Sequence, residues 1–139
     1  MLEPDERAGA TEGGPSTVAF YGGVVAVTVT PCRSVGEIDA EAMNGLCRLL
    51  GGCGCHGVFV AGSTGDMPLL DEEDRRTLIE AARAALDGRT TLYGGVTGAG
   101  VRQTIRYAKN AAADGADVAV LMAPGSLRFS QPELSDYAR

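Results

Sequence analysis

The feature that most constrains the fold is a strand-like run that recurs about every 30 residues, each time followed by a helix-like segment. The runs are short, apolar and rich in β-branched residues, which favours strands with no face in water. They lie at residues 24–29, 57–61, 91–96 and 117–122. Buried strands that alternate with helical crossovers are typical of a parallel α/β sheet, so we predict the order β-α-β-α-β-α-β-α.

Each helix-like segment carries apolar residues at spacings of three and four. Asp71, with Asp74 three residues further on, is placed to cap the second helix. A fourth helix is expected over residues 131–139. The apolar positions expected to face the sheet are Ile38, Ala42, Met43, Leu46, Leu49 and Leu50 in the first helix, Leu78, Ala81, Ala82, Ala85 and Leu86 in the second, and Val101, Ile105, Ala108 and Ala112 in the third.

The chain has 139 residues, which accommodate four such units. A closed eight-unit barrel needs about 250 residues, so the four units over residues 20–139 amount to half of a TIM (β/α)8 barrel. An open sheet is the alternative on periodicity alone, because βαβ units build both architectures. Residues 1–19 have little hydrophobic pattern and several turn formers, and they are expected to form a flexible N-terminal tail.

The net charge of -6 argues against nucleic acid as a partner, because a phosphate backbone would be repelled and the arginines are scattered along the chain. No apolar run reaches the roughly 18 residues that a membrane helix needs. The first residues are acidic and glycine-rich, unlike a secretory signal. We therefore expect a cytoplasmic chain that binds neither nucleic acid nor membrane and keeps its thiols reduced.

Four cysteines raise the question of a metal or redox site. Cys53, Cys55 and His56 lie together, but structural zinc sites usually use two pairs of ligands separated by two to four residues. Cys32 and Cys47 are isolated. We therefore expect the cysteines to be small buried residues or strand-entry residues and His56 to be structural, with no metal and no cofactor.

Two glycine-rich segments flank the second predicted strand. A Gly-x-Gly-x-x-Gly pattern at Gly52, Gly54 and Gly57 precedes the strand, whereas a dinucleotide-binding turn follows a strand and opens a helix, so nucleotide binding is not expected. The segment from Gly62 to Asp66 follows the strand, where α/β folds build their active sites. Its hydroxyls and backbone amides suit a carboxylate, and a capped glycine turn explains them equally well.

Several motifs follow one another in a recognisable order. They are VTVTP at 27–31, GVFVAGSTGD at 57–66, Leu70 with DEED at 71–74, Gly94-Gly95 at a strand end, Ala123-Pro124, and SQPEL at 130–134. In this order they resemble the dihydrodipicolinate synthase / N-acetylneuraminate lyase family over about residues 20–139. The Gly-Ser-Thr-Gly-acid stretch in a strand-to-loop position is the most specific of them.

This resemblance implies a (β/α)8 barrel, usually a homotetramer, that condenses or cleaves 2-oxo acids such as pyruvate through a Schiff base to a lysine. It also implies that residues 20–139 are the N-terminal half of that barrel, units one to four. It implies that Ser63 joins a proton relay with tyrosines. It also implies that Thr64 and the neighbouring amides, with Gly62 and Gly65, hold the carboxylate of a small 2-oxo-acid substrate. Asp66 stands where most members have glutamate, as a loop-stabilising acid.

The sequence departs from the family pattern after the fourth predicted strand. The family has a relay tyrosine two residues after Pro124, where this chain has Ser126. A serine is shorter by a whole ring and a poorer acid, although it could pass a proton through a water. Arg128 is better explained as a solvated loop residue than as a ligand for a substrate anion.

In the family pattern the catalytic tyrosine of the fifth strand and the Schiff-base lysine of the sixth lie beyond residue 139. Lys109 is the one lysine of the chain and falls at the flank of the third predicted helix, where it should extend into solvent. Three hypotheses follow: part of a 2-oxo-acid aldolase or lyase that is inactive alone, a half-barrel subunit completed by another chain, and a non-catalytic binding or scaffold protein. A homo-oligomer or a complementing half-barrel chain is the expected protein partner.

Overall fold

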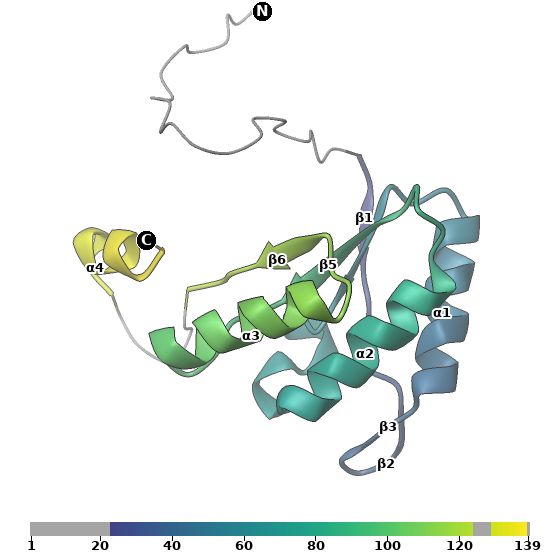
Figure 1. Ribbon diagram of the computed structural model, residues 1–139, viewed down its shortest axis with the longest axis horizontal. Helices are drawn as coiled ribbons and strands as arrows, with labels where there is room; N and C mark the ends of the chain where they lie inside the picture. Colours follow the sequence, from purple (N-terminus) through teal and green to yellow (C-terminus); the bar gives the residue numbers. More distant parts are fainter. Residues whose placement is uncertain (1–22, 124–128, 139) are drawn as a thin grey trace, which may run out of the picture.

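The computed structural model describes residues 23–123 and 129–138. The tail expected over residues 1–19 lies outside these ranges. One parallel sheet has the strand order β1-β4-β5-β6, so each new strand lies on the same side of the one before (Figure 1). Its strands are β1 (Val25–Val27), β4 (Gly57–Val60), β5 (Thr91–Gly95) and β6 (Val118–Val120).

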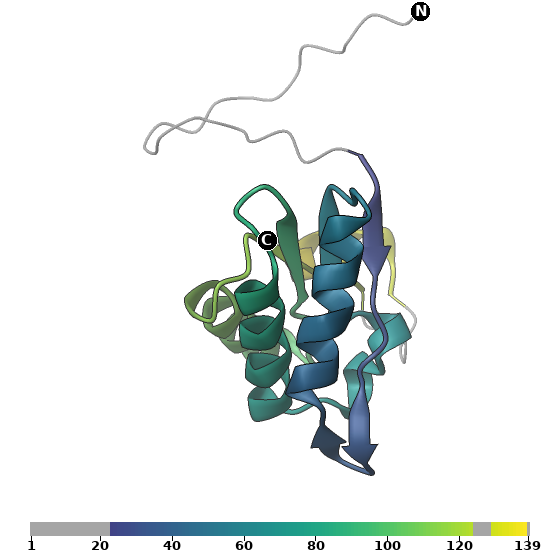
Figure 2. The same cartoon turned by 90° about the vertical axis from the view of Figure 1, so that its right-hand side faces the viewer.

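Helices join the strands in the predicted alternation. They are α1 (Ala40–Gly52), α2 (Glu72–Ala85), α3 (Val101–Ala113) and α4 (Gln131–Ala138). α1 and α2 pack side by side in both views of the molecule (Figures 1 and 2). Because crossovers between parallel strands are right-handed, strands added in one direction carry their helices on one face, as in a barrel. A doubly wound sheet reverses direction instead, so the strand order supports the barrel over the open-sheet alternative.

A short antiparallel hairpin between β1 and α1 was not predicted from the sequence. It pairs β2 (Cys32–Ser34) with β3 (Glu37–Ile38). The expectation that Ile38 belongs to the first helix is therefore wrong. The helix begins one residue after Asp39, whose Oδ1 accepts a hydrogen bond from the Ala42 amide at 3.0 Å, and such a cap sets where a helix starts.

The core lies between the helices and the two central strands. β4 and β5 are mostly buried, with Val58, Val60 and Leu92 fully inaccessible to solvent. The two outer strands differ from the prediction, which buried every strand on both faces. Val27 of β1 is 48% exposed and the middle residue of β6, Ala119, is also exposed. Among residues 23–123 and 129–138, each of these strands pairs with a single neighbour in the sheet, so its other edge has no strand beside it there.

The buried face of α3 also differs from the expected apolar stripe. Val101 and Ile105 are each 50% exposed, whereas Thr104, Tyr107 and Ala111 are buried. The polar atoms of the buried face have partners: the Thr104 hydroxyl accepts a hydrogen bond from the Gly98 amide at 3.0 Å, and the Tyr107 hydroxyl accepts one from Gln103 at 2.7 Å. Satisfied polar groups can replace aliphatic ones in a core, which apolar periodicity alone does not detect.

The cysteines are less buried than expected. Only Cys47 is buried among the four, and burial raises the pKa of its thiol to about 11. Cys32 and Cys53 are exposed, so the buried alternative of the prediction does not apply to them; Cys32 is the first residue of β2, and Cys53 lies four residues before β4. His56 is structural, as predicted, because its Nδ1 accepts a hydrogen bond from the Val24 amide at 3.1 Å and joins the start of β1 to that of β4.

Within residues 23–123 and 129–138, no helix has the length and apolar character needed to cross a membrane. Across the same ranges, no three or more histidine, cysteine, aspartate or glutamate side chains gather as a metal site would require.

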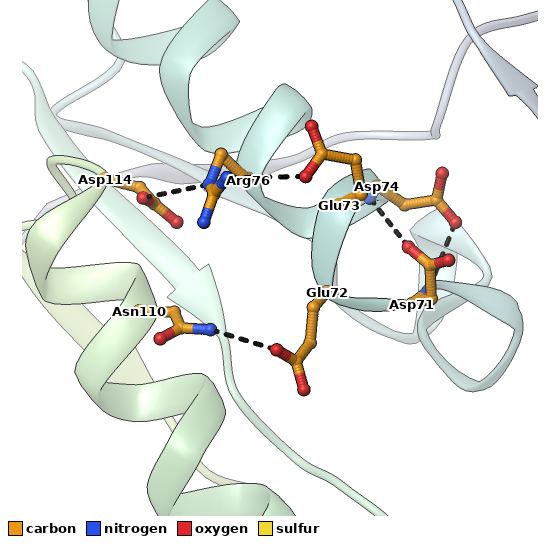
Figure 3. Close-up of polar contacts among 7 residues, drawn as sticks. All are labelled: Asp71, Glu72, Glu73, Asp74, Arg76, Asn110 and Asp114. Atoms are coloured by element: carbon orange, nitrogen blue, oxygen red, sulfur yellow. Dashed lines mark hydrogen bonds and ion pairs between the residues drawn. The ribbon is translucent and has the colours of Figure 1, made fainter.

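The capping box at the start of α2 is the clearest local device that was predicted. Asp71 accepts a hydrogen bond from the Asp74 amide at 2.9 Å, and Asp74 accepts one from the Asp71 amide at 3.1 Å (Figure 3). Replacing Asp71 by alanine should lower the free energy of unfolding by about 1 kcal/mol, because it leaves a helical amide without a partner. Urea unfolding followed by circular dichroism measures the loss. The control is Glu80→Ala, at an exposed position of the same helix, and an equal loss in both variants would contradict the capping role.

Gly95, at the end of β5, packs directly on the preceding strand. A Cβ atom at this position would lie 2.0 Å from the carbonyl oxygen of Ala61. We expect Gly95→Ala to destabilise the fold by about 1–3 kcal/mol, because the backbone of one strand must move to admit the methyl group. Gly45→Ala is the matched control, because nothing lies within 4 Å of a Cβ atom added at Gly45. Alanine is a better helix former than glycine inside α1, so the free energy of unfolding of this variant should rise slightly. Unchanged stability of Gly95→Ala in urea would refute the close approach.

Candidate functional site

The candidate site lies where the carboxyl ends of the parallel strands meet. Gly62 to Asp66 leaves the carboxyl end of β4, as predicted, and continues through the short helical turns η1 (Ser63–Gly65) and η2 (Met67–Leu69) into α2. Gly62 and Gly65 are buried, whereas Ser63 and Thr64 are exposed. The two glycines of the turn are therefore packed inside the protein, while its serine and threonine are exposed to solvent.

The amides of this turn divide into two groups. The Gly65 and Met67 amides donate to the carbonyl oxygen of Gly62 at 3.0 and 3.2 Å, which closes the turn. The Ser63 and Thr64 amides stand at the start of the turn, where a helix leaves its first N–H groups without an internal partner. Within the described part of the chain, no hydrogen bond uses either of them. Two neighbouring amides and two hydroxyls are thus available to an anion.

The turn is held in its shape from both sides. Ala61 and Asp66, which flank it, both have φ of 55°, a conformation that residues other than glycine seldom adopt. The Thr30 hydroxyl, which follows β1, donates a hydrogen bond of 2.7 Å to the Gly65 carbonyl oxygen. Unusual backbone conformations persist only where surrounding structure enforces them, and they cluster at functional sites. The loop is therefore specified by its neighbours as well as by its own sequence.

The carboxylate of Asp66 does not brace the loop as expected. It makes no hydrogen bond or ion pair with any described residue. The Asp66 amide instead donates to the Ser63 carbonyl oxygen at 3.3 Å. The stabilising role expected of this acid therefore falls to its backbone and to Thr30.

Thr97 and Arg75 are two residues of this edge that sequence reasoning missed. The Thr97 hydroxyl accepts a hydrogen bond from the Met122 amide at 2.8 Å and donates to the Met122 carbonyl oxygen, which joins the ends of β5 and β6. Arg75 is only 6% exposed, and its guanidinium reaches back to the same edge from α2. Arg75 lies three, four and seven residues before the buried Leu78, Ile79 and Ala82. This helical spacing in the sequence indicates that it shares their buried face.

An open cleft of about 640 Å³ lies beside the turn. Its lining includes Met67 to Asp71 together with Thr97, Gln103, Tyr107 and Met122. Ser63 and Thr64 are not among its lining residues. The structure therefore places the predicted carboxylate-binding residues at the strand edge and leaves the cleft to other side chains.

The other residues singled out in the sequence lie away from the turn. Lys109 is exposed on α3, as predicted. His56 lies just before β4, at the opposite end of that strand from Ser63. Ser126 and Arg128 lie outside the described residues. The described structure thus gathers Gly62, Ser63, Thr64 and Gly65, and no amine side chain lies with them.

The sequence is similar to a family of known enzymes. The model of the dihydrodipicolinate synthetase family matches residues 20–139. An uncharacterised DapA-like lyase of Rhizobium meliloti is 32% identical over 117 residues, which cover 84% of this chain and 39% of the relative. The 4-hydroxy-tetrahydrodipicolinate synthase 1 of Streptomyces coelicolor is 31% identical over 121 residues, covering 87% of this chain and 40% of the relative. The chain therefore spans about two fifths of the length of these relatives.

Solved structures agree with the sequence match. A dihydrodipicolinate synthase from Bacillus anthracis superposes with a TM-score of 0.79 at 26% identity, over 86% of this chain and 41% of that chain. The sialic acid aldolase of Ruminococcus gnavus, at 24% identity and a TM-score of 0.77, shares the fold over 84% of this chain and 39% of its own. These neighbours are (β/α)8 barrels, and this chain corresponds to an N-terminal half of one. With its strand order, its Gly-Ser-Thr-Gly turn and a match over residues 20–139, the chain belongs to the dihydrodipicolinate synthetase family.

Proposed function

We propose that this chain carries the carboxylate-binding part of a Schiff-base-forming 2-oxo-acid aldolase or lyase. Thr64 and the amides of the Gly62–Gly65 turn hold the carboxylate of a small 2-oxo acid such as pyruvate, and Ser63 relays a proton. The observation that carries this proposal is the turn itself, whose first amides have no partner in the described structure and whose Ser63 and Thr64 are exposed. Such an arrangement favours a carboxylate through several short donors around one point.

The chemistry assigned to these residues is orientation and proton transfer. A carboxylate held by fixed amides orients the adjacent ketone, so that an amine can attack it from one direction. The attack forms a carbinolamine, and loss of water then gives the Schiff base, which requires protons to move to and from the oxygen. In this proposal the Ser63 hydroxyl lies beside the bound carboxylate and takes part in that transfer. The attacking amine comes from outside the described residues in this proposal, because Lys109 is exposed on α3 and lacks the desolvated pocket that a nucleophilic lysine needs.

The open edges of the sheet indicate that this chain associates with another protein chain. β1 and β6 each pair with one neighbour, and exposed apolar side chains lie at or next to them, including Val24 at 63%, Val27 at 48% and Leu121 at 39% exposure. Unpaired strand edges with apolar side chains are sites of association. The proposal therefore includes further β/α units at these edges, supplied by another chain or by a second copy of this one. It also includes a cytoplasmic location. A non-catalytic binding protein that keeps the turn without the chemistry is the alternative.

The carboxylate assignment predicts a specific binding defect. Pyruvate titrated into the chain should shift the Ser63 and Thr64 amide signals in nitrogen–proton correlation spectra. Thr64→Val should weaken that binding by about tenfold, because it removes a donor to a charged group. Thr77→Val on α2 is the matched control and should bind as the unchanged chain does. The assignment fails if pyruvate shifts neither amide, or if both variants bind alike.

Borohydride reduction separates binding from covalent chemistry. With pyruvate and borohydride the chain alone should form no reduced adduct on Lys109, as judged by peptide mass spectrometry. An adduct on Lys109 would contradict the placement of the amine outside the described residues. Binding without an adduct, followed by an adduct on an added chain that carries further β/α units, would favour the enzyme over the binding protein.

The open edges predict self-association. In sedimentation velocity the chain should run larger than its 14.3 kDa monomer. Val27→Lys should shift it towards the monomer, because a charge on an edge strand opposes pairing. Val35→Lys is the matched control: Val35 is fully exposed in the hairpin turn, between β2 and β3. A sharp monomer for the unchanged chain would remove the argument for a partner at these edges.

A further inference from the structure

Arg75 is a buried cation with no acidic partner in the described structure. Its side chain points inward from the first turns of α2 and the residue is 6% exposed. Its neighbour Arg76 pairs with Glu73 and Asp114 at the surface (Figure 3), whereas no described carboxylate forms an ion pair with Arg75. Burying a charge without an ion-pair partner costs free energy. A buried arginine therefore usually makes hydrogen bonds that offset this cost.

The Arg75 guanidinium joins two loops at the carboxyl edge of the sheet. One terminal nitrogen donates to the Gly95 carbonyl oxygen at 2.8 Å, at the end of β5. The other donates to the Met67 carbonyl oxygen at 2.8 Å and, more weakly, to that of Thr97 at 3.5 Å. The group also lies 4.4 Å from the centre of the Tyr107 ring, a distance that permits a cation–π contact. A planar fork of donors spans separate carbonyl groups in a way that a single ammonium does not.

Both loops lead directly to the proposed binding turn. The Met67 amide donates to the Gly62 carbonyl oxygen at 3.2 Å, so the guanidinium that fixes the Met67 carbonyl also orients a bond that closes the turn. Gly95 packs against the Ala61 carbonyl, immediately before the turn, so its position limits where the turn can start. Arg75 thus acts on Ser63 and Thr64 through the backbone on either side of them.

We propose that Arg75 is a positioning residue that holds the Gly62–Gly65 turn in its anion-binding shape by fastening the loop after β4 to the end of β5. The ligand named in this inference rests on the proposed function, whereas the hydrogen bonds of Arg75 do not depend on it. The side chain stays charged: burial lowers its pKa, yet an arginine remains protonated at neutral pH. Carbonyl oxygens accept hydrogen bonds from both terminal nitrogens and the Tyr107 ring lies against the group, whereas the buried Nε has no partner among the described residues.

Amide hydrogen exchange tests the positioning role without any ligand. In Arg75→Met, exchange of the Gly65, Asp66 and Met67 amides should rise by about tenfold or more relative to the amides of β4, because the hydrogen bonds from a charged group are lost. Arg76→Met, the adjacent surface arginine, is the matched control and should leave the ratio unchanged. Equal acceleration of the turn and of β4 would mean a global loss of stability and would overturn the inference.

Pyruvate binding is the second readout and separates this inference from the proposed function. Arg75→Met should weaken binding by about tenfold or more, and Arg76→Met should leave it intact. If the unchanged chain does not bind pyruvate but the exchange pattern holds, the proposed function fails and the positioning role stands. If pyruvate binds equally well to Arg75→Met and its turn stays protected, the positioning role fails alone.

Arg75→Lys covers the case in which the methionine variant does not fold. Lysine keeps the charge but loses the fork, so it should restore stability more completely than it restores protection of the turn and pyruvate binding. Full recovery of turn protection by lysine would show that charge alone suffices and would overturn the assignment of the bridge to the guanidinium.

Discussion

The pairing of β4 with β5 is the interaction on which the rest of this structure depends. These are the two strands with neighbours on both sides, and their inner residues form the centre of the core. Their register places Val60, the last residue of β4, beside Gly94, so that β5 ends one residue beyond β4. Because the strands are parallel, both carboxyl ends open at one edge of the sheet, where the turn after β4 and the loop after β5 meet. The absence of a side chain on Gly95 lets the two backbones approach there.

The candidate site is built largely from backbone. The atoms proposed to bind a carboxylate are amides and two small hydroxyls, and the residues that contact this turn or its neighbours are Thr30 from the end of β1, Gly95 from β5 and Arg75 from α2. This division explains how a turn of small residues acquires a defined shape. Small residues give access to a ligand but little packing, so the rigidity comes from neighbours that are distant in the sequence.

The architecture was largely predictable because it follows from local patterns. The apolar runs near β4 and β5 and the Asp71 capping box each depend on residues close together in the chain, and each was found where it was expected. The inner face of α3 was not predicted, since Tyr107 and Thr104 are buried through hydrogen bonds to other residues. The exposure of β1 and β6 was missed because composition shows that a strand is apolar but not how many neighbours it has.

The same distinction applies to the site. The sequence by itself determined the parallel α/β arrangement, the place of the Gly-Ser-Thr-Gly turn after the second strand of the sheet and the solvent-facing position of Lys109. Tertiary structure decided what surrounds that turn. Arg75 bridges two loops, Thr30 bonds to Gly65, and the Asp66 carboxylate has no hydrogen-bond or ion-pair partner among the described residues. The reason is physical. Periodicity and turn chemistry are local properties of the chain, whereas the partner of a buried guanidinium or an orphan amide is fixed only when distant strands align.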